Sequence, residues 1–238
     1  MSAETLISVL LQHRGPFHGV VPFDPAKDKL HPFDFTSGNK ELTSAQIGDT
    51  DSFAAYINAT LKAHHCRYGI GGYGEHRTLY ARSKHFDASS AAAPEPRRLH
   101  LGTDLWGPAG TRVMSPLDGI VHSFAFNNND SDYGATLILS HNLDGAGFHS
   151  LYGHLSLNSL KNLQEGRNIR KGEVIGEFGM RFENGNWPPH LHFQLIGDMQ
   201  GWKGDYPGVC KFSEKEQWLD NCPDPDLILQ MNQFLRPE

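Results

Sequence analysis

Two histidines at alternate positions, His190 and His192, are the residues of this chain that most directly suggest chemistry. On a β-strand, side chains at positions i and i+2 project from the same face, so these two imidazoles would lie side by side. Upstream, His100 and Asp104 are four positions apart with Gly102 between them, and zinc accepts both imidazole and carboxylate ligands. The two pairs together predict a metal site.

Zinc in a hydrolytic site takes three protein ligands and leaves a fourth position for water, whose pKa falls to about 7. His100, Asp104 and one histidine of residues 190–192 would supply the three ligands, and the other histidine would then lie beside the bound water. His154, at the end of a predicted strand, is a further candidate for this hydrolytic site. An imidazole near its ordinary pKa works as a general acid or base at neutral pH.

Most of the 14 histidines need no chemical role, because a single histidine on a strand is usually a packed or surface residue. For His100 and Asp104 taken alone, the alternative is a hydrogen-bonded turn. We assign no role to the histidines outside these motifs, which are His13, His18, His31, His64, His65, His76, His85, His122, His141 and His149.

Three short motifs occur in an order that resembles a known family. Residues 100–104 read His-Leu-Gly-Thr-Asp, residues 152–155 read Tyr-Gly-His-Leu, and residues 189–193 read Pro-His-Leu-His-Phe. This order is similar to that of the lysostaphin-type zinc endopeptidases, the LytM-like family twenty-three of metallopeptidases. The family's intervening pattern is also present, including Tyr133-Gly134, and the match covers about residues 97 to 197.

The resemblance implies one zinc ion per chain, bound by His100, Asp104 and His192. It implies that His154 and His190 are the catalytic pair, which orients or deprotonates the water and stabilises the oxyanion of the tetrahedral intermediate. It also implies a zinc-dependent endopeptidase that cuts peptidoglycan in its stem-peptide cross-links or its interpeptide bridges.

The chain departs from the family pattern at two places. Gln194 stands where many relatives have glutamate, which we expect to change only the surroundings of the ligands. Some relatives place a tyrosine a few positions ahead of the first ligand to assist the transition state. Here residues 91–94 are three alanines and a proline, so Tyr80 or Tyr73 would have to reach the site from elsewhere.

Residues 71–80 resemble a lead-in found in one branch of the family, including some chains that join this domain to aminotransferase-like enzymes. We hypothesise that Glu75 or Arg77 faces the zinc cleft. Either residue would be a substrate contact or an inhibitory plug, since a carboxylate could take the open zinc position. The alternative is a structural ion pair between Glu75 and Arg77 that supports the domain junction.

Short β-rich runs separated by glycine and proline make up the chain from Arg97 onward. They predict strands at residues 113–114, 119–125, 136–141, 149–154, 174–179 and 190–196. Because no helical pattern lies between these runs, they predict a mainly β fold, an antiparallel β-sandwich or partly closed barrel, and not a βαβ fold. The family resemblance adds the duplicated hybrid motif of a lysostaphin-like catalytic domain.

Helices are expected outside this region, at residues 1–12, at residues 51–65 after the N-cap residues Thr50 and Asp51, and at residues 226–234 after Pro225. We predict three parts. An N-terminal α+β extension spans residues 1–95 and ends in a linker at 89–96. A lysostaphin-like zinc peptidase domain spans residues 96–200, and an irregular segment with a short helix spans residues 201–238.

Composition excludes several other classes of protein. The 21 basic and 27 acidic residues give a net charge of −6, which offers no electrostatic reason to expect nucleic acid as a partner. No apolar run reaches the roughly 20 residues of a transmembrane helix. Residues 1–12 show no signal peptide, which indicates a cytoplasmic protein, or a periplasmic or extracellular one if a signal was removed. The oligomeric state is not indicated.

The three cysteines, Cys66, Cys210 and Cys222, are an odd number and do not form a disulfide framework. Cys210 and Cys222 could pair across a loop in an oxidising compartment, and free thiols are the favoured alternative. Neither arrangement suggests catalysis by cysteine.

Three other functions stay open on the same scaffold. The site could hydrolyse a cytosolic peptide or amide. A non-catalytic regulator is disfavoured because all five functional positions are intact. A histidine phosphocarrier of the glucose-permease type needs two facing imidazoles but no ligating aspartate, so Asp104 favours hydrolysis.

Overall fold

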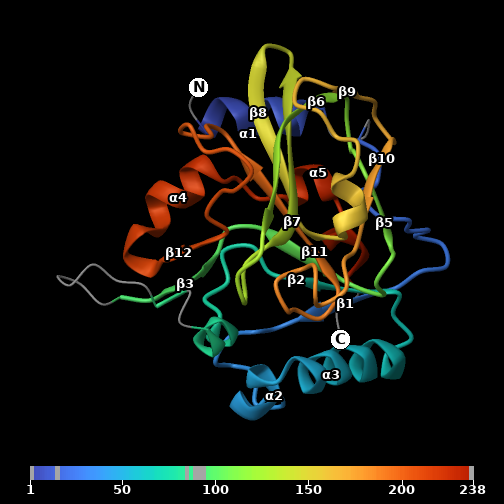
Figure 1. Cartoon of the computed structure of the whole chain (residues 1–238), viewed down its shortest axis with the longest axis vertical. Coiled ribbons are helices and arrows are strands. Elements are labelled where there is room, and N and C mark those ends of the chain that lie inside the picture. The colour runs from blue at the N-terminus through green and yellow to red at the C-terminus, as the bar shows by residue number, and fades with distance from the viewer. Residues whose placement is uncertain (1–2, 14–16, 84–85, 88–94, 236–238) are drawn as a thin grey trace.

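The computed structural model of the chain describes residues 3–13, 17–83, 86–87 and 95–235. Its strands are β1 (Leu30–Phe33), β2 (Tyr68–Gly71), β3 (Arg97–His100), β4 (Thr103–Trp106), β5 (Arg112–Met114), β6 (Gly119–Asn127), β7 (Gly134–Leu143), β8 (Ala146–Leu155), β9 (Asn168–Ile169), β10 (Val174–Glu177), β11 (His190–Ile196) and β12 (Val209–Lys211). An eight-stranded sheet in the order β1-β2-β4-β11-β8-β7-β6-β9 forms the centre (Figure 1). It is antiparallel except where β1 runs parallel to β2, and two small sheets pair β5 with β10 and β3 with β12.

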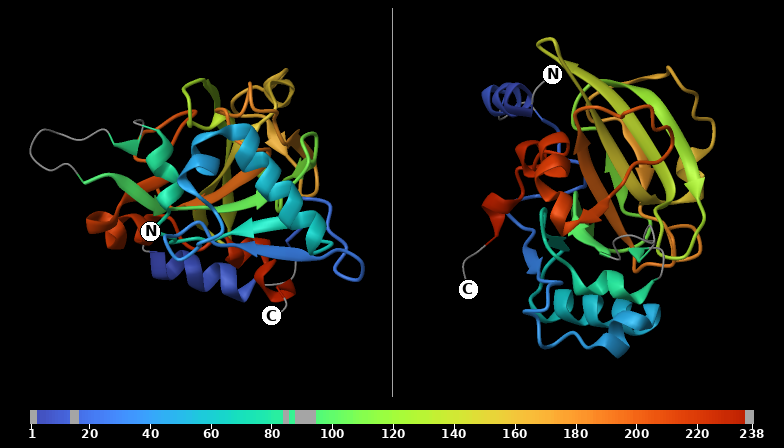
Figure 2. Two further views of the ribbon diagram at one scale, coloured as in Figure 1. Left: turned by 90° about the horizontal axis from the view of Figure 1, so that it is seen from below. Right: turned by 90° about the vertical axis from the view of Figure 1, so that its left-hand side faces the viewer.

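Helices lie around this sheet. They are α1 (Ala3–Gln12), α2 (Ser44–Gly48), α3 (Thr50–Ala63), α4 (Lys215–Asn221) and α5 (Asp226–Leu229), with 3-10 turns η1 (Thr78–Arg82), η3 (Leu157–Leu160), η4 (Phe212–Glu214) and η5 (Asn232–Phe234). α2 and α3 lie together at one end of the molecule, below β1 and β2, and α1 packs against β8 and α5 (Figures 1 and 2). Among the described residues, no helix combines the length and apolar character that crossing a membrane requires.

The mainly β fold and all six predicted strands are confirmed. β6, β7 and β8 extend further than predicted, and residues 89–94 of the predicted linker lie outside the described residues. Sequence patterns missed β1 to β4, β9 and β12, whose two to four residues show little alternation of polar and apolar side chains. β5 and β10 are equally short and were found because proline and glycine bound them. The proposed division at residues 95–96 and 200–201 stays a prediction.

The predicted N-cap of the long helix is wrong by one or two positions. Asp49 caps α3, with a carboxylate oxygen that accepts from the backbone N–H of Ser52 at 2.8 Å. Thr50 lies inside the helix, and its hydroxyl donates to the carbonyl of Asn186 at 2.9 Å. The better cap is Asp49 because the side chain of Thr50 is used for a contact far along the chain.

The predicted helix at residues 226–234 is correct at its start and too long. α5 ends at Leu229, and Gln230 then adopts a left-handed conformation with φ of 50°. A carboxylate oxygen of Asp226 accepts from the backbone N–H groups of Met231 and Asn232. This turn closes on the helix start and prevents the helix from continuing.

The N-terminal part of the chain shares its core with the strands that carry the site motifs. β2 pairs directly with β4, with Gly71 opposite Asp104. Phe53 of α3 is completely buried, and its ring lies 5.6 Å from the ring of Trp106 in β4. A buried aromatic side chain contributes several kcal/mol, so these contacts join residues before 80 firmly to the sheet.

This shared core predicts that deletion of residues 1–90 gives insoluble protein. The deletion removes β1 and β2, exposes the edge of β4 and uncovers Trp106. The soluble fraction after expression, compared with that of the full chain, measures the effect. A soluble truncated protein with a higher rate of peptide hydrolysis would contradict this account and identify the N-terminal extension as an inhibitory plug.

Candidate metal centre and cleft

The strand register brings the two sequence motifs together. His192 of β11 lies directly opposite Asp104 of β4 in an antiparallel pair, so their side chains are neighbours on one face of the sheet. His100 ends β3, just before the turn to β4. The turn passes over the site at Gly102, where a Cβ atom would lie 2.6 Å from the ring of His192 and 2.8 Å from the carbonyl oxygen of Phe193. Only glycine fits there.

Hydrogen bonds assign a tautomer to both of these histidines. Nδ1 of His100 lies 3.0 Å from the carbonyl oxygen of Gly72, to which it must donate, so Nε2 carries a lone pair. Gln194 donates from its amide nitrogen to the carbonyl of Pro207 at 3.1 Å, which turns its amide oxygen to Nε2 of His192 at 2.9 Å. Nε2 of His192 therefore donates, and Nδ1 carries a lone pair.

The three electron-rich atoms face one another in the protein interior. Nε2 of His100 is 2.9 Å from Nδ1 of His192. Oδ1 of Asp104 is 3.1 Å from Nδ1 of His192 and 3.3 Å from Nε2 of His100. Two lone pairs in direct contact repel unless a cation lies between them. Zinc bonds of 2.0–2.1 Å in a tetrahedron would separate the ligand atoms by about 3.3 Å, close to what is found. The donor set therefore fits zinc.

The protonation states also suit a metal site. Burial and, to a smaller extent, the nearby Arg77 lower the pKa of His100 to about 4, so the ring is neutral at pH 7. Burial opposes ionisation of Asp104, but His100 and Arg77 hold its pKa well below the usual range. Metal ligands must be deprotonated, and these two residues already are.

Arg77 forms an ion pair with Asp104, and Glu75 forms an ion pair with Arg77. The guanidinium donates from Nη1 to Oδ2 of Asp104 at 2.5 Å and from Nε to Oε2 of Glu75 at 2.6 Å. Arg77 is 1% exposed and lines the cleft, whereas Glu75 is absent from the described residues that line it. Both residues that the sequence singled out are thus joined in an ion-pair chain that ends on Asp104.

His154 and His190 form a second histidine pair next to the three metal-ligand candidates. Their ring centroids are 4.1 Å apart. Nδ1 of His154 donates to the carbonyl of Asn184, and Nδ1 of His190 donates to the carbonyl of Pro188, both at 2.8 Å. Burial lowers the pKa of His190 to about 4 and that of His154 well below its ordinary value. Each ring is therefore neutral, with an Nε2 lone pair available.

Different features of the backbone position these two rings. His190 lies opposite Trp106 across β11 and β4, and the two rings stack at 3.9 Å with an interplanar angle of 14°. His154 follows Gly153, the residue opposite His192, so regular alternation would turn it to the other face of the sheet. A left-handed φ of 62° at His154 changes its direction. Such strain in a residue other than glycine is often found at functional sites.

A scan against protein families matches residues 98–203 to peptidase family M23. The chain carries a peptidase family M23 domain. The resemblance of the three motifs is thereby confirmed. The L-Ala–D-Glu endopeptidase of Bacillus subtilis is 29% identical over 143 residues, which are 55% of this chain and 41% of that protein. The chain thus spans about two fifths of the length of this relative.

Solved structures are also similar to this chain. The catalytic domain of the antimicrobial peptidase lysostaphin from Staphylococcus simulans is 21% identical, with a TM-score of 0.39, over 69% of this chain and 96% of that one. A zinc containing peptidase from Vibrio cholerae is 26% identical, with a TM-score of 0.34, over 46% of this chain and 30% of that one.

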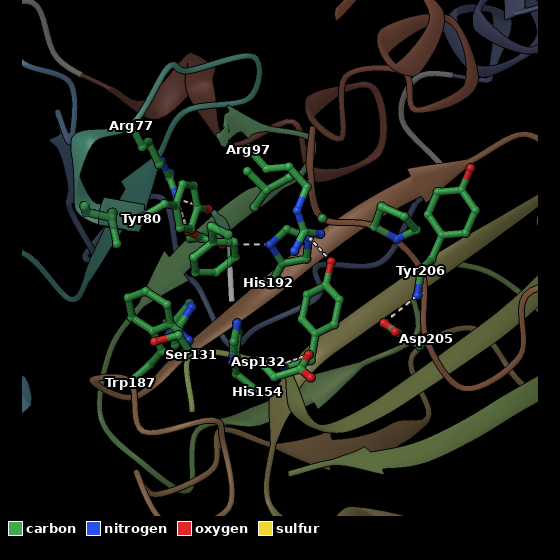
Figure 3. Close-up of a pocket in the computed structure, with 18 of the residues that line it drawn as sticks. Arg77, Tyr80, Arg97, Ser131, Asp132, His154, Trp187, His192, Asp205 and Tyr206 are labelled. Atoms are coloured by element: carbon green, nitrogen blue, oxygen red, sulfur yellow. Dashed lines mark hydrogen bonds and ion pairs between the residues drawn. The ribbon is translucent and has the colours of Figure 1, made fainter. Parts of the chain in front are cut away.

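Segments outside the M23 domain help to enclose its cleft, a cavity of about 250 Å³. Arg77, Tyr80 and Trp187 lie on one side and Tyr206 on the opposite side, with His154 and His192 between them (Figure 3). The lining is rich in aromatic rings, contributed by Tyr80, Phe86, Trp106, Tyr133, Trp187, Trp202 and Tyr206. The cleft therefore depends on residues from the N-terminal and C-terminal parts as well as the M23 domain.

Tyr133 lines the cleft, and sequence reasoning assigned it no role. Its hydroxyl is 3.3 Å from Nε2 of His192 and 3.4 Å from the amide oxygen of Gln194. Gly153 leaves the space for its ring, since a Cβ there would lie 2.5 Å from Tyr133. The signal available in the sequence was its place beside Gly134 in the M23 pattern.

The C-terminal segment also reaches the candidate metal centre. Gln194 donates to the thiol sulfur of Cys222 at 3.3 Å as well as to Pro207. Cys210 and Cys222 are buried free thiols in the structure, so they do not form the disulfide that the sequence left open. These contacts hold the amide that fixes the tautomer of His192.

Of the two tyrosines that the sequence considered, Tyr80 lines the cleft and Tyr73 does not. Tyr80 accepts a bond from Nη1 of Arg77 at 3.3 Å, and burial raises the pKa of Tyr80, so its hydroxyl stays protonated. Tyr73 donates to the carbonyl of Cys222 at 2.6 Å. Tyr80 is therefore the better candidate to donate a hydrogen bond to a substrate.

Replacement of Tyr80 by phenylalanine should lower kcat about 100-fold, the usual cost of removing one donor to a developing oxyanion. The amount of bound zinc should be unchanged. In the described part of the chain, the hydroxyl of Tyr80 bonds to Arg77 and to none of the three ligand candidates. Tyr73→Phe is the matched control and should keep full kcat. Equal rates for wild type and Tyr80→Phe would exclude this role.

Proposed function

We propose that this protein is a zinc-dependent endopeptidase that hydrolyses peptide bonds in peptidoglycan, with one zinc ion per chain. The observation that carries the proposal is the convergence of three lone-pair atoms, Nε2 of His100, Oδ1 of Asp104 and Nδ1 of His192, on one space. Membership of the M23 family supports peptide hydrolysis. Peptidoglycan as the substrate class is supported by a relative named an L-Ala–D-Glu endopeptidase.

Bound zinc would polarise the scissile carbonyl and lower the pKa of water, so that a hydroxide nucleophile can form near neutral pH. His100, Asp104 and His192 would hold the ion. His154 and His190 offer Nε2 lone pairs that can accept the proton of the attacking water and return it to the leaving amine. The backbone carbonyls behind their Nδ1 atoms keep both rings in the tautomer that this proton transfer needs.

The aromatic walls would bind the peptide and exclude water. Trp106 and Trp187 are 1% and 3% exposed, and their ring centroids lie 3.9 Å and 6.4 Å from that of His190. A cleft with such walls binds through apolar contact and strengthens electrostatic interactions inside it, because it lowers the local dielectric. An extended peptide chain is a suitable occupant.

The test is digestion of purified peptidoglycan by the zinc-loaded protein. We expect new amino groups, peptide fragments in the mass spectrum that identify the bond, and no products after removal of zinc with a chelator. New reducing sugar ends without new amino groups would show a glycosidase and overturn the proposal. Products from soluble peptides alone would keep the endopeptidase and reject peptidoglycan as its substrate.

A further inference from the structure

The N-terminal segment supplies a buried cation to the metal centre from outside the M23 match. Arg77 lies 21 positions before the first matched residue, Arg98, and yet its side chain is almost completely buried against Asp104. A charge is costly to bury unless it is paired. Here the pairing partner is itself one of the three residues that face the metal position.

The guanidinium divides the two oxygens of Asp104 between two tasks. Oδ2 accepts from Nη1 of Arg77 at 2.5 Å, while Oδ1 faces His192 at 3.1 Å and His100 at 3.3 Å. A carboxylate that is free to rotate can bind a metal through either oxygen or through both. With Oδ2 engaged, Asp104 presents only Oδ1.

A second set of contacts fixes the guanidinium itself. Oε2 of Glu75 accepts from Nε of Arg77 at 2.6 Å, and Oε1 of Glu75 accepts from the backbone N–H of Phe35 at 3.1 Å. The guanidinium carbon lies 5.3 Å from the ring centroid of Phe35. At Gly71, a Cβ would be 2.8 Å from Nη2 of Arg77, so glycine leaves the room that the guanidinium occupies.

We propose that Arg77 is a positioning residue that holds Asp104 as a one-oxygen metal ligand, with Glu75 fixing Arg77 from behind. The inference rests on the metal site of the proposed function and extends that site into the N-terminal segment. Arginine suits the task because its planar fork donates to Glu75 and Asp104 at once, whereas the single ammonium of lysine cannot span both carboxylates. Partners behind a ligand commonly set metal affinity.

The experiment measures zinc affinity by chelator competition, together with the melting temperature of the metal-free protein. Arg77→Lys should bind zinc about 10–100-fold more weakly than wild type, the usual effect of losing a partner behind a ligand. Glu75→Gln, which leaves Arg77 in place but loosens it, should weaken zinc binding in the same direction. Arg98→Lys is the matched control: Arg98 is 9% exposed, pairs with Asp87 and lies outside the cleft lining, so its zinc affinity should equal that of wild type.

A purely structural role for Arg77 makes a different prediction. Arg77→Lys would then melt at a lower temperature without zinc and, while folded, bind zinc as wild type does, and this result would overturn the inference. If Arg77→Lys does not fold, wild-type affinity in Glu75→Gln overturns it instead. A wild-type protein that binds no zinc would overturn both this inference and the proposed function, whereas unchanged affinity in the variants overturns the inference alone.

Discussion

His154→Ala should keep its zinc and lose turnover by about 100-fold to 10,000-fold, the range that general acid-base catalysis commonly contributes. His154 is not one of the three residues whose ligand atoms lie within 4.8 Å of one another. Its Nε2 faces the cleft because Nδ1 donates to the carbonyl of Asn184. Removing the ring should therefore remove a proton acceptor and leave the ion in place.

The measurement is kcat on a peptide substrate, with zinc content determined on the same sample. His149→Ala is the matched control, since His149 lies on β8 as well, five positions earlier, and is outside the cleft lining. It should keep both zinc and turnover. Loss of zinc in His154→Ala would place His154 among the ligands and contradict the assignment.

His192→Ala should lose both zinc and activity. It removes one of the three proposed zinc ligands, an imidazole that lies between Asp104 and Gln194. Loss of a residue that hydrogen-bonds to a metal ligand commonly costs about 10–100-fold in metal affinity. Loss of a ligand itself should therefore cost more than about 100-fold. The apparent dissociation constant for zinc, from competition with a chelator, measures this loss.

His190→Ala is the informative comparison because it changes the same residue type, two positions away on β11. Its ring stacks on Trp106 and does not belong to the close group of three ligand atoms. It should keep zinc near the wild-type affinity and lose turnover. Equal zinc loss in His190→Ala and His192→Ala would show that the strand, and not the imidazole of His192, is what matters.

Sequence reasoning singled out the histidines and the aspartate that the structure brings together, and their roles stay predictions. Two imidazoles at i and i+2 lie on one face of β11 as strand geometry requires. His100, Asp104 and His192 come together because β4 and β11 are neighbours, which no local pattern shows. For this step the order of the family motifs was needed in addition to spacing.

The residues that hydrogen-bond to the proposed ligands could not be predicted, because they depend on contacts between distant parts of the chain. Gln194 became the partner of His192 only through Pro207 and Cys222. The sequence left Arg77 open between a cleft contact and an ion pair with Glu75, and the structure shows both together with a third contact to Asp104. Backbone strain at His154 likewise has no signal in the sequence.

The most direct test of the account is the zinc content of purified protein, followed through removal and return of the metal. We predict about one zinc per chain by elemental analysis, release of peptides from purified peptidoglycan, loss of that release on chelation, and its recovery with one equivalent of zinc. Protein that releases peptides at full rate with no bound metal would contradict the role assigned to His100, Asp104 and His192.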